Sequence, residues 1–379
     1  MSADMGQGRP TGGRVRCGRQ AGPGRFWDPA HGRLSCAVMS TTPAARTSGD
    51  GADGAAIFAL APATGAPVYR GRPVAHLLGT PFERLWGLLV DGTDASGLPP
   101  AEPFNLPVRT GNVRVDVQSA LAQLTPVWAY RPLVDIPASQ AREDLARASV
   151  MTLSFVAQSA RGEDVPAVPQ REVDLGRTIT ERFLVRWRGE ADPVAVEALD
   201  TFWLALAENG LSPSTRTARL AAEQGADVAA CLAAAVAVAS GPLGGGASAR
   251  ALALVDQAER TGDPAAVVAD YLDRYGTLPG FGDPHLPEDA RGELLREACV
   301  RVGAARLDVA ETVAAAGGTA LARAADDDVA GYRPGALFWG AVMLDHVGVP
   351  ANLLAALYVC GRTAGWSAHV LEVQRSLRG

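Results

Sequence analysis

The most apolar run of the chain, residues 228–239, leads directly into a glycine-rich turn, Ala-Ser-Gly-Pro-Leu-Gly-Gly-Gly-Ala-Ser at 239–248. The run is long enough for a buried helix, and a new helical pattern starts near Ala249. Three consecutive glycines permit positive φ angles and a close approach of the backbone to another group. The turn is therefore either a glycine cap that ends a core helix or the floor of a binding site.

Helical periodicity continues through most of the sequence. Residues 113–128, for example, place Val117 and Leu121 on one face. Strand-like patterns are confined to residues 57–69, where two short extended segments flank a turn. We therefore predict an all-α chain, with one long alanine-rich helix over residues 214–239 at its centre.

Composition excludes several classes of function. The chain has 379 residues, of which 47% are hydrophobic, so it can bury a large core and form about two domains. Its net charge of −6 argues against nucleic acid or an anionic membrane as a partner. No apolar run reaches the roughly 20 residues that a membrane span needs. Residues 1–53 are rich in Gly, Arg, Ser, Thr and Ala, and we expect them to be disordered, with either Met1 or Met39 as the translation start.

Cysteine and histidine usage points to a cytoplasmic protein without a metal site. None of the five cysteines forms a CxxC pair, and Cys231, Cys299 and Cys360 lie in apolar helical patterns, where thiols act as small hydrophobes. A reducing compartment suits such thiols. No two of the five histidines have the spacing of metal ligands.

Several short motifs occur in a fixed order along the chain. They are Tyr69-Arg70-Gly71-x-Pro73, Asn209-Gly210-Leu211-x-x-Ser214-Thr215, the turn at 241–247, Leu278-Pro279-Gly280-Phe281-Gly282, Gly335-Ala336-Leu337 and Gly361-Arg362-x-Ala364-Gly365-Trp366-x-Ala368-His369. In this order they resemble the citrate synthase family over residues 57–375. The resemblance implies a mostly helical homodimer, in which each subunit has a large domain and a small mobile domain.

On this resemblance, residues 54–247 form the large domain, residues 248–334 the small domain, and residues 335–379 return to the large domain. The family condenses an acyl-CoA, usually acetyl-CoA, with oxaloacetate. A carboxylate removes the α-proton of the thioester, one His hydrogen-bonds the enol oxygen, a second His protonates the oxaloacetate carbonyl, and Arg residues hold its carboxylates. The CoA thioester is a co-substrate, and no tightly bound cofactor is expected.

The positions that match the family's catalytic residues are substituted in this chain. Gly244 stands at the enol-binding His, Asp283 at the second catalytic His, and Gly331 at the catalytic Asp, near the carboxylates of residues 326–328. Asn209 stands at an oxaloacetate-binding His. We expect Gly244 to open space for a bulkier substrate.

Other family positions are kept. Arg362 matches a carboxylate-binding Arg, and a guanidinium suits bidentate recognition of a carboxylate. The resemblance places the turn at residues 278–282 against CoA, with these residues as the contacts: Leu278, Pro279, Gly280, Phe281 and Gly282. Arg291 would approach a CoA phosphate, unless it is simply a loop Arg at a helix N-terminus.

Three further side chains have two interpretations each. His285 is either an exposed loop histidine or, with Asp283, a relocated acid–base pair, because histidine titrates near neutrality. Glu208 is either a pocket carboxylate or an exposed group at a helix end. His369 matches a family His, and we interpret it as packing or hydrogen bonding between helices.

Two classes of function therefore stay open. The first is a citrate synthase-like enzyme that joins an acyl-CoA to a 2-oxo or other carboxylic acid, with an altered substrate or mechanism. The second is a non-catalytic paralogue, a CoA-binding or regulatory dimer partner that pairs with itself or with an active citrate synthase. Ordinary citrate formation supported by Asp283, His285 or residues 326–328 is a third, less favoured, interpretation.

Overall fold

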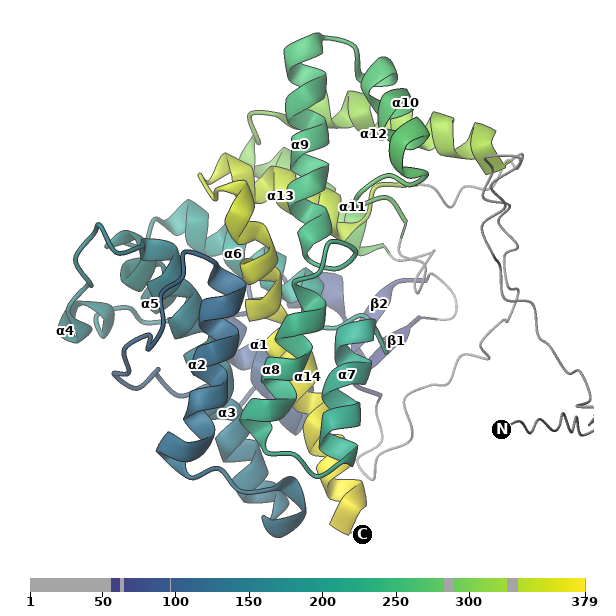
Figure 1. Cartoon of the computed structure of the whole chain (residues 1–379). Helices are drawn as coiled ribbons and strands as arrows, with labels where there is room; N and C mark the ends of the chain where they lie inside the picture. The colour runs from purple at the N-terminus through teal and green to yellow at the C-terminus, as the bar shows by residue number, and fades with distance from the viewer. Residues whose placement is uncertain (1–55, 62–64, 96, 283–289, 326–332, 379) are drawn as a thin grey trace, which may run out of the picture. The chain divides into compact units, whose positions relative to one another are not determined.

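The computed structural model describes residues 56–61, 65–95, 97–282, 290–325 and 333–378. Residues 47–379 form one compact unit, and its described part is mostly helical, as expected (Figure 1). The expectation for residues 1–53 lies outside the described residues, and the division at 248 and 334 stays a prediction.

The described chain contains short strands, α-helices and 3-10 turns in the following order. They are β1 Phe58–Leu60, β2 Pro67–Tyr69, β3 Arg72–Pro73, η1 Val74–Leu77, α1 Phe82–Asp91, α2 Val113–Trp128, η2 Leu133–Asp135, α3 Ala138–Arg161, α4 Gln170–Val173, α5 Ile179–Arg188, α6 Pro193–Leu206, α7 Pro213–Glu223, α8 Val228–Ala239, α9 Gly246–Thr261, α10 Pro264–Tyr275, α11 Arg291–Val302, α12 Leu307–Ala325, α13 Ala336–His346, η3 Ala351–Leu353 and α14 Leu354–Arg378.

The expected extended segments near the start of the described chain form a small antiparallel sheet. β1 pairs with β2, with Phe58 opposite Tyr69, and β2 pairs with β3. This sheet positions Tyr69, whose ring is fully buried. The prediction of paired strands within residues 57–69 is confirmed.

The single long helix expected over residues 214–239 is wrong, because the chain forms two helices, α7 and α8. Gly225 lies between them with φ +75°, a left-handed conformation that ends helical structure. Asp227 then starts α8, since its carboxylate accepts hydrogen bonds from the backbone N–H groups of Ala229 and Ala230. Helical periodicity cannot reveal this break, because both helices bury apolar faces.

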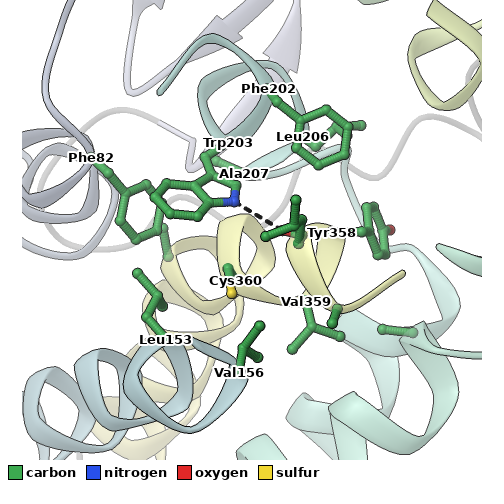
Figure 2. Packing of buried hydrophobic residues seen from close by; sticks show 14 of the residues in the cluster. Phe82, Leu153, Val156, Phe202, Trp203, Leu206, Ala207, Tyr358, Val359 and Cys360 are labelled. Carbon is green, nitrogen blue, oxygen red and sulfur yellow. Dashed lines mark hydrogen bonds between the residues drawn. The ribbon is translucent and has the colours of Figure 1, made fainter. Parts of the chain in front are cut away.

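Helix α14 organises the core of the described unit. It packs against α1, α3, α6, α7, α8 and α9, and it runs beside α7 and α8 in Figure 1. Figure 2 shows the centre of this packing, where the Trp203 indole donates a hydrogen bond of 2.9 Å to the carbonyl of Leu357. Cys360 is fully buried beneath the Trp203 ring, as predicted for a thiol acting as a hydrophobe.

Two expected absences can be checked against the structure. Among the described residues, no helix is long and apolar enough to cross a membrane. The same part of the chain contains no group of three or more His, Cys, Asp or Glu side chains arranged to hold a metal ion.

Candidate active site

The segment after α6 carries a carboxylate that is completely buried. Glu208 has no exposed surface, and its Oε2 lies 3.1 Å from Nη2 of Arg362 on α14. Its Oε1 accepts a hydrogen bond of 2.9 Å from the backbone N–H of Asn209. Of the two interpretations of Glu208, the structure therefore excludes the exposed helix end.

Arg362 is also fully buried and is held mainly by the turn between α6 and α7. Nη1 donates to the Asn209 side-chain oxygen at 3.0 Å, and Nη2 donates to the hydroxyls of Ser212 and Thr215. The Nε group of Arg362 has no hydrogen-bond partner among the described residues. An unpaired buried donor is costly, so this Nε group is a candidate for an added oxygen acceptor.

A second guanidinium reaches the same segment. Arg291, at the start of α11, is 2% exposed, and its Nη1 donates to the backbone carbonyl of Glu208 at 2.8 Å. The Tyr69 hydroxyl donates to that same carbonyl at 3.1 Å. Burial raises the pKa of Tyr69 to about 12, so this phenol stays protonated. Arg291 thus lies inside the cluster around Glu208 and not at an exposed position suited to a CoA phosphate.

His369 completes the cluster from the next turns of α14. Its Nε2 lies 3.6 Å from Oε2 of Glu208, and its Nδ1 lies 3.1 Å from Nη1 of Arg219 on α7. Glu372 binds Arg219 as well, and it lies 3.8 Å from the same Nδ1. The interpretation of His369 as a link between helices is confirmed.

The charges of the cluster shift one another's protonation equilibria. Burial alone would raise the pKa of Glu208, but Arg362 and His369 outweigh it, and the net pKa is below the ordinary value. Burial alone would lower the pKa of His369, but Glu208 and Glu372 raise it above the ordinary value. Glu208 is therefore an anion that serves as the counter-ion of Arg362, and the His369 ring lies beside it.

The glycine turn is tightly packed at each of its three consecutive glycines. A Cβ atom on Gly244 would lie 2.7 Å from the carbonyl oxygen of Ala239, and one on Gly245 would lie 2.6 Å from the Tyr358 ring. A Cβ on Gly246 would lie 2.9 Å from a backbone oxygen of the same turn. The expectation that Gly244 opens space is therefore wrong, because backbone atoms fill the position.

This turn is connected to the charged cluster through α14. Tyr358, which packs on Gly245, precedes Arg362 by four residues, so the two side chains share one face of the helix. The turn follows α8, whose C-cap is Ser240, and none of the glycines of the turn has a positive φ, so the turn is not a left-handed glycine cap. The interpretation of the turn as the floor of a binding site stays a prediction.

The turn at residues 278–282 is fixed to the start of α13. The Gly335 N–H donates to the Gly280 carbonyl at 2.7 Å, and the Gly282 N–H donates to the Arg333 carbonyl at 3.1 Å. Gly280 has φ +75°, and a Cβ there would lie 3.0 Å from Phe338, so this position needs glycine. Leu278 and Pro279 are buried and Phe281 packs partly buried against Phe338, which leaves Gly282 as the exposed residue of the turn.

Several predicted site residues lie outside the described residues: Asp283, His285, Gly331 and residues 326–328. The structure brings together Asn209, Arg362 and Arg291, which the sequence assigned to two different ligands. It adds Glu208 and Tyr69 to them. A signal for Glu208 was present in the sequence. Arg362 and His369 are seven residues apart, so they lie two turns apart on one face of the helix. Two basic side chains on one buried face indicate that an acidic residue lies nearby.

Comparison with known proteins gives the class of this chain. Residues 48–378 match the family model for the citrate synthase C-terminal domain, and the chain belongs to the citrate synthase family. A Mycobacterium tuberculosis protein named "Putative citrate synthase 2" is 51% identical over 314 residues, which cover 82% of this chain and 84% of that protein. The 2-methylcitrate synthase of Shewanella oneidensis is 28% identical over 207 residues, 52% of each chain.

Solved structures support the same fold. The citrate synthase of Thermoplasma acidophilum, in a ternary complex with carboxymethyl coenzyme A and oxaloacetate, superposes with a TM-score of 0.67 at 20% identity. That match covers 81% of this chain and 86% of the other. The citrate synthase of Thermotoga maritima gives a TM-score of 0.61 at 21% identity, covering 83% and 87%. The resemblance in the sequence motifs is thus confirmed for family and fold.

Proposed function

We propose that this protein joins an acyl-CoA to a 2-oxo acid, with the acid held at Arg362. In the proposed reaction the α-carbon of the thioester gives up a proton and attacks the acid's carbonyl carbon. The carbonyl oxygen takes up a proton, and water then cleaves the thioester to release the CoA thiol. The observation that carries the proposal is the buried Arg362 guanidinium, whose Nε lacks a partner among the described residues.

Arg291 and Asn209 extend this acid site. Two guanidinium groups that contact one short segment suit an acid with more than one oxygen function. We therefore assign Arg291 to the acid and not to a CoA phosphate. The CoA thioester is assigned to the turn at residues 278–282, where the backbone is anchored to α13. Asp283 and His285 follow that turn in sequence, and we assign the proton transfers to them.

The alternative, a CoA-binding paralogue without turnover, also has structural support. The Nη groups of Arg362 are engaged by protein acceptors, and Gly244 leaves no room for a side chain in the glycine turn. An acid must displace one of these acceptors or use Nε. The two proposals are separated by whether a thiol is released.

The experiment measures free thiol after purified protein is mixed with acetyl-CoA or propionyl-CoA and a panel of 2-oxo acids. Release that is lost in Asp283→Ala, and kept in the matched surface variant Asp273→Ala, supports the enzyme. Thermal stabilisation by CoA without thiol release supports the paralogue. The absence of both effects contradicts both proposals.

We also propose that two copies of the chain pair, as the resemblance implies, and that they do so through α2 and α8. The two helices pack together, and apart from Arg114 their exposed positions carry only small or apolar residues: Ala122, Pro126, Val127, Ala237 and Val238. A hollow of about 270 Å³ lies at one end of this surface, between α2, α8 and α14. A surface whose exposed positions are mostly small or apolar, with Arg114 as the exception, suits a second copy of the chain better than a charged ligand.

Light scattering tests the pairing. The wild type should have twice the chain mass of 39.3 kDa, and Val127→Glu with Val238→Glu should reduce it to one chain. Leu175→Glu is the control, because Leu175 is 80% exposed elsewhere. An unchanged mass in the double variant contradicts this interface. A hetero-oligomer with an active citrate synthase would instead appear as a species that contains both proteins.

We also propose that the protein is cytoplasmic. Its buried free thiols suit a reducing compartment: Cys231, Cys299 and Cys360.

A further inference from the structure

The two ends of Glu208 hold the two residues to which the acid is assigned. Oε1 accepts from the Asn209 backbone N–H at 2.9 Å, and Oε2 lies 3.1 Å from Arg362. The only other charged group near Oε2 among the described residues is His369, at 3.6 Å. Glu208 therefore holds Arg362 and Asn209 in one arrangement, and His369 is the third group beside its carboxylate.

The hydrogen bond at Nδ1 of His369 determines whether Nε2, the nitrogen that faces Glu208, carries a proton. Nδ1 lies 3.1 Å from Nη1 of Arg219, and a guanidinium can only donate hydrogen bonds. In the neutral ring Nδ1 must then accept, so the proton is on Nε2, the atom that faces Glu208. Nε2 has no hydrogen-bond acceptor nearer than this carboxylate in the described part of the chain.

The outer pair connects this buried ring to the surface. His369 is 1% exposed, whereas the Arg219 and Glu372 side chains are 26% and 24% exposed. The charged groups that face the ring are Glu208 after α6, Arg219 on α7, and Glu372 on α14. Protonation at Nδ1 replaces the hydrogen bond from Arg219 with an attraction to Glu372. The pH of the solvent around Arg219 and Glu372 therefore affects the charge of the ring beside Glu208.

We propose that His369 is a positioning residue for acid binding: its Nε2 group attracts Glu208 across 3.6 Å, and Glu208 holds Arg362 and Asn209 in the geometry that receives the acid. This inference rests on the proposed function, because it assumes that Arg362 receives the acid. His369 touches no substrate and acts only through Glu208. When the ring is protonated it neutralises Glu208 more completely, which leaves more of the Arg362 charge for the acid, so acid binding tightens as pH falls.

The test uses two substitutions that differ in one hydrogen-bond donor. His369→Gln keeps an amide N–H in the direction of Nε2, and His369→Leu removes it at similar volume. Calorimetry measures the binding of pyruvate, 2-oxobutanoate, oxaloacetate and CoA to the full chain. We expect His369→Leu to weaken acid binding about tenfold with CoA binding unchanged, and His369→Gln to recover most of the loss. Equal loss of acid and CoA binding, or no recovery in His369→Gln, overturns the inference.

A milder variant keeps the proposal testable where His369→Leu does not fold. Glu372→Gln removes the anion that favours the protonated ring, so the pH at which acid binding weakens should move down. Glu223→Gln, an exposed Glu on α7, is the matched control and should leave it unchanged. An unmoved profile in Glu372→Gln overturns the inference.

Failure of the proposed function looks different from failure of this inference. Acid binding that depends on His369 in a protein that releases no thiol contradicts the enzyme and supports the positioning role. Thiol release, together with acid binding that is unchanged in the His369 variants, supports the enzyme and contradicts the positioning role. A wild-type chain that binds no acid contradicts both.

Discussion

The carboxyl group of Asp200 on α6 should destabilise the folded protein increasingly as pH rises from the acidic range to neutrality. Thr180 donates a 2.5 Å hydrogen bond to it, and the N–H of Phe82, at the start of α1, donates another. Burial, with the neighbouring Glu83 carboxylate adding to it, raises the pKa of Asp200 to about 7, well above that of an aspartate in water. The folded state thus holds this proton much more tightly than the unfolded chain does.

The sign and size of the effect follow from that difference. Below the pKa that Asp200 has in the unfolded chain, both states are protonated at this residue and no charge is buried. As pH rises from the unfolded pKa to the folded pKa, the unfolded chain ionises while the folded state keeps its proton, so stability falls by up to about 4 kcal/mol for roughly three pKa units, and above the folded pKa the loss stays constant. Asp200→Asn removes the charge but gives up one acceptor, which costs about 1 kcal/mol. The variant should therefore gain about 3 kcal/mol near pH 8 and lose about 1 kcal/mol near pH 4.

The assay is urea unfolding of wild type and Asp200→Asn at several pH values between these limits, with Asp273→Asn as an exposed control. The difference in unfolding free energy should change sign as pH rises, and Asp273→Asn should track the wild type. A difference that stays constant with pH would refute the reasoning, because it would show that Asp200 ionises alike in both states.

Three other changes test the packing and the charges. Gly244→Ala should cost about 1–3 kcal/mol by overpacking against the Ala239 carbonyl, seen as a lower thermal midpoint, and an unchanged midpoint would contradict the packed turn. Glu208→Ala should cost about 3–5 kcal/mol in urea unfolding, because it leaves Arg362 buried without its counter-ion; a loss typical of a surface pair would show that water reaches the cluster. Asp227→Ala should cost about 1 kcal/mol through the lost α8 cap, and helical circular dichroism during melting measures it.

The sequence was informative wherever a local pattern determines structure. The period of residues 113–128 predicted α2 with its exact bounds, and the motif order predicted the family. The break between α7 and α8 was missed because Gly225 and Asp227 act through backbone geometry, which apolar periodicity does not record. The burial of Arg291 beside Glu208 was missed for another reason. A motif names a residue type, but only tertiary packing decides which neighbour a long side chain reaches.

The same limit applies to the glycine turn. The substitution at Gly244 was visible in the sequence, and a smaller residue suggested free space. The space depends on where the carbonyl of Ala239 points, and that is set by how α8 ends. Glu208 illustrates the converse, since its burial follows from contacts with α14 that are distant in sequence.

The contacts that build the cluster join parts of the chain far apart in sequence. Arg362 and Glu208 are separated by 154 positions, Tyr69 and Glu208 by 139, and Arg291 and Glu208 by 83. Closing such long loops costs entropy before any contact offsets it, so we expect these pairings to form late in folding. Before α14 docks, water can solvate the Glu208 carboxylate. We therefore expect the cluster around Glu208 to be completed only with the finished fold.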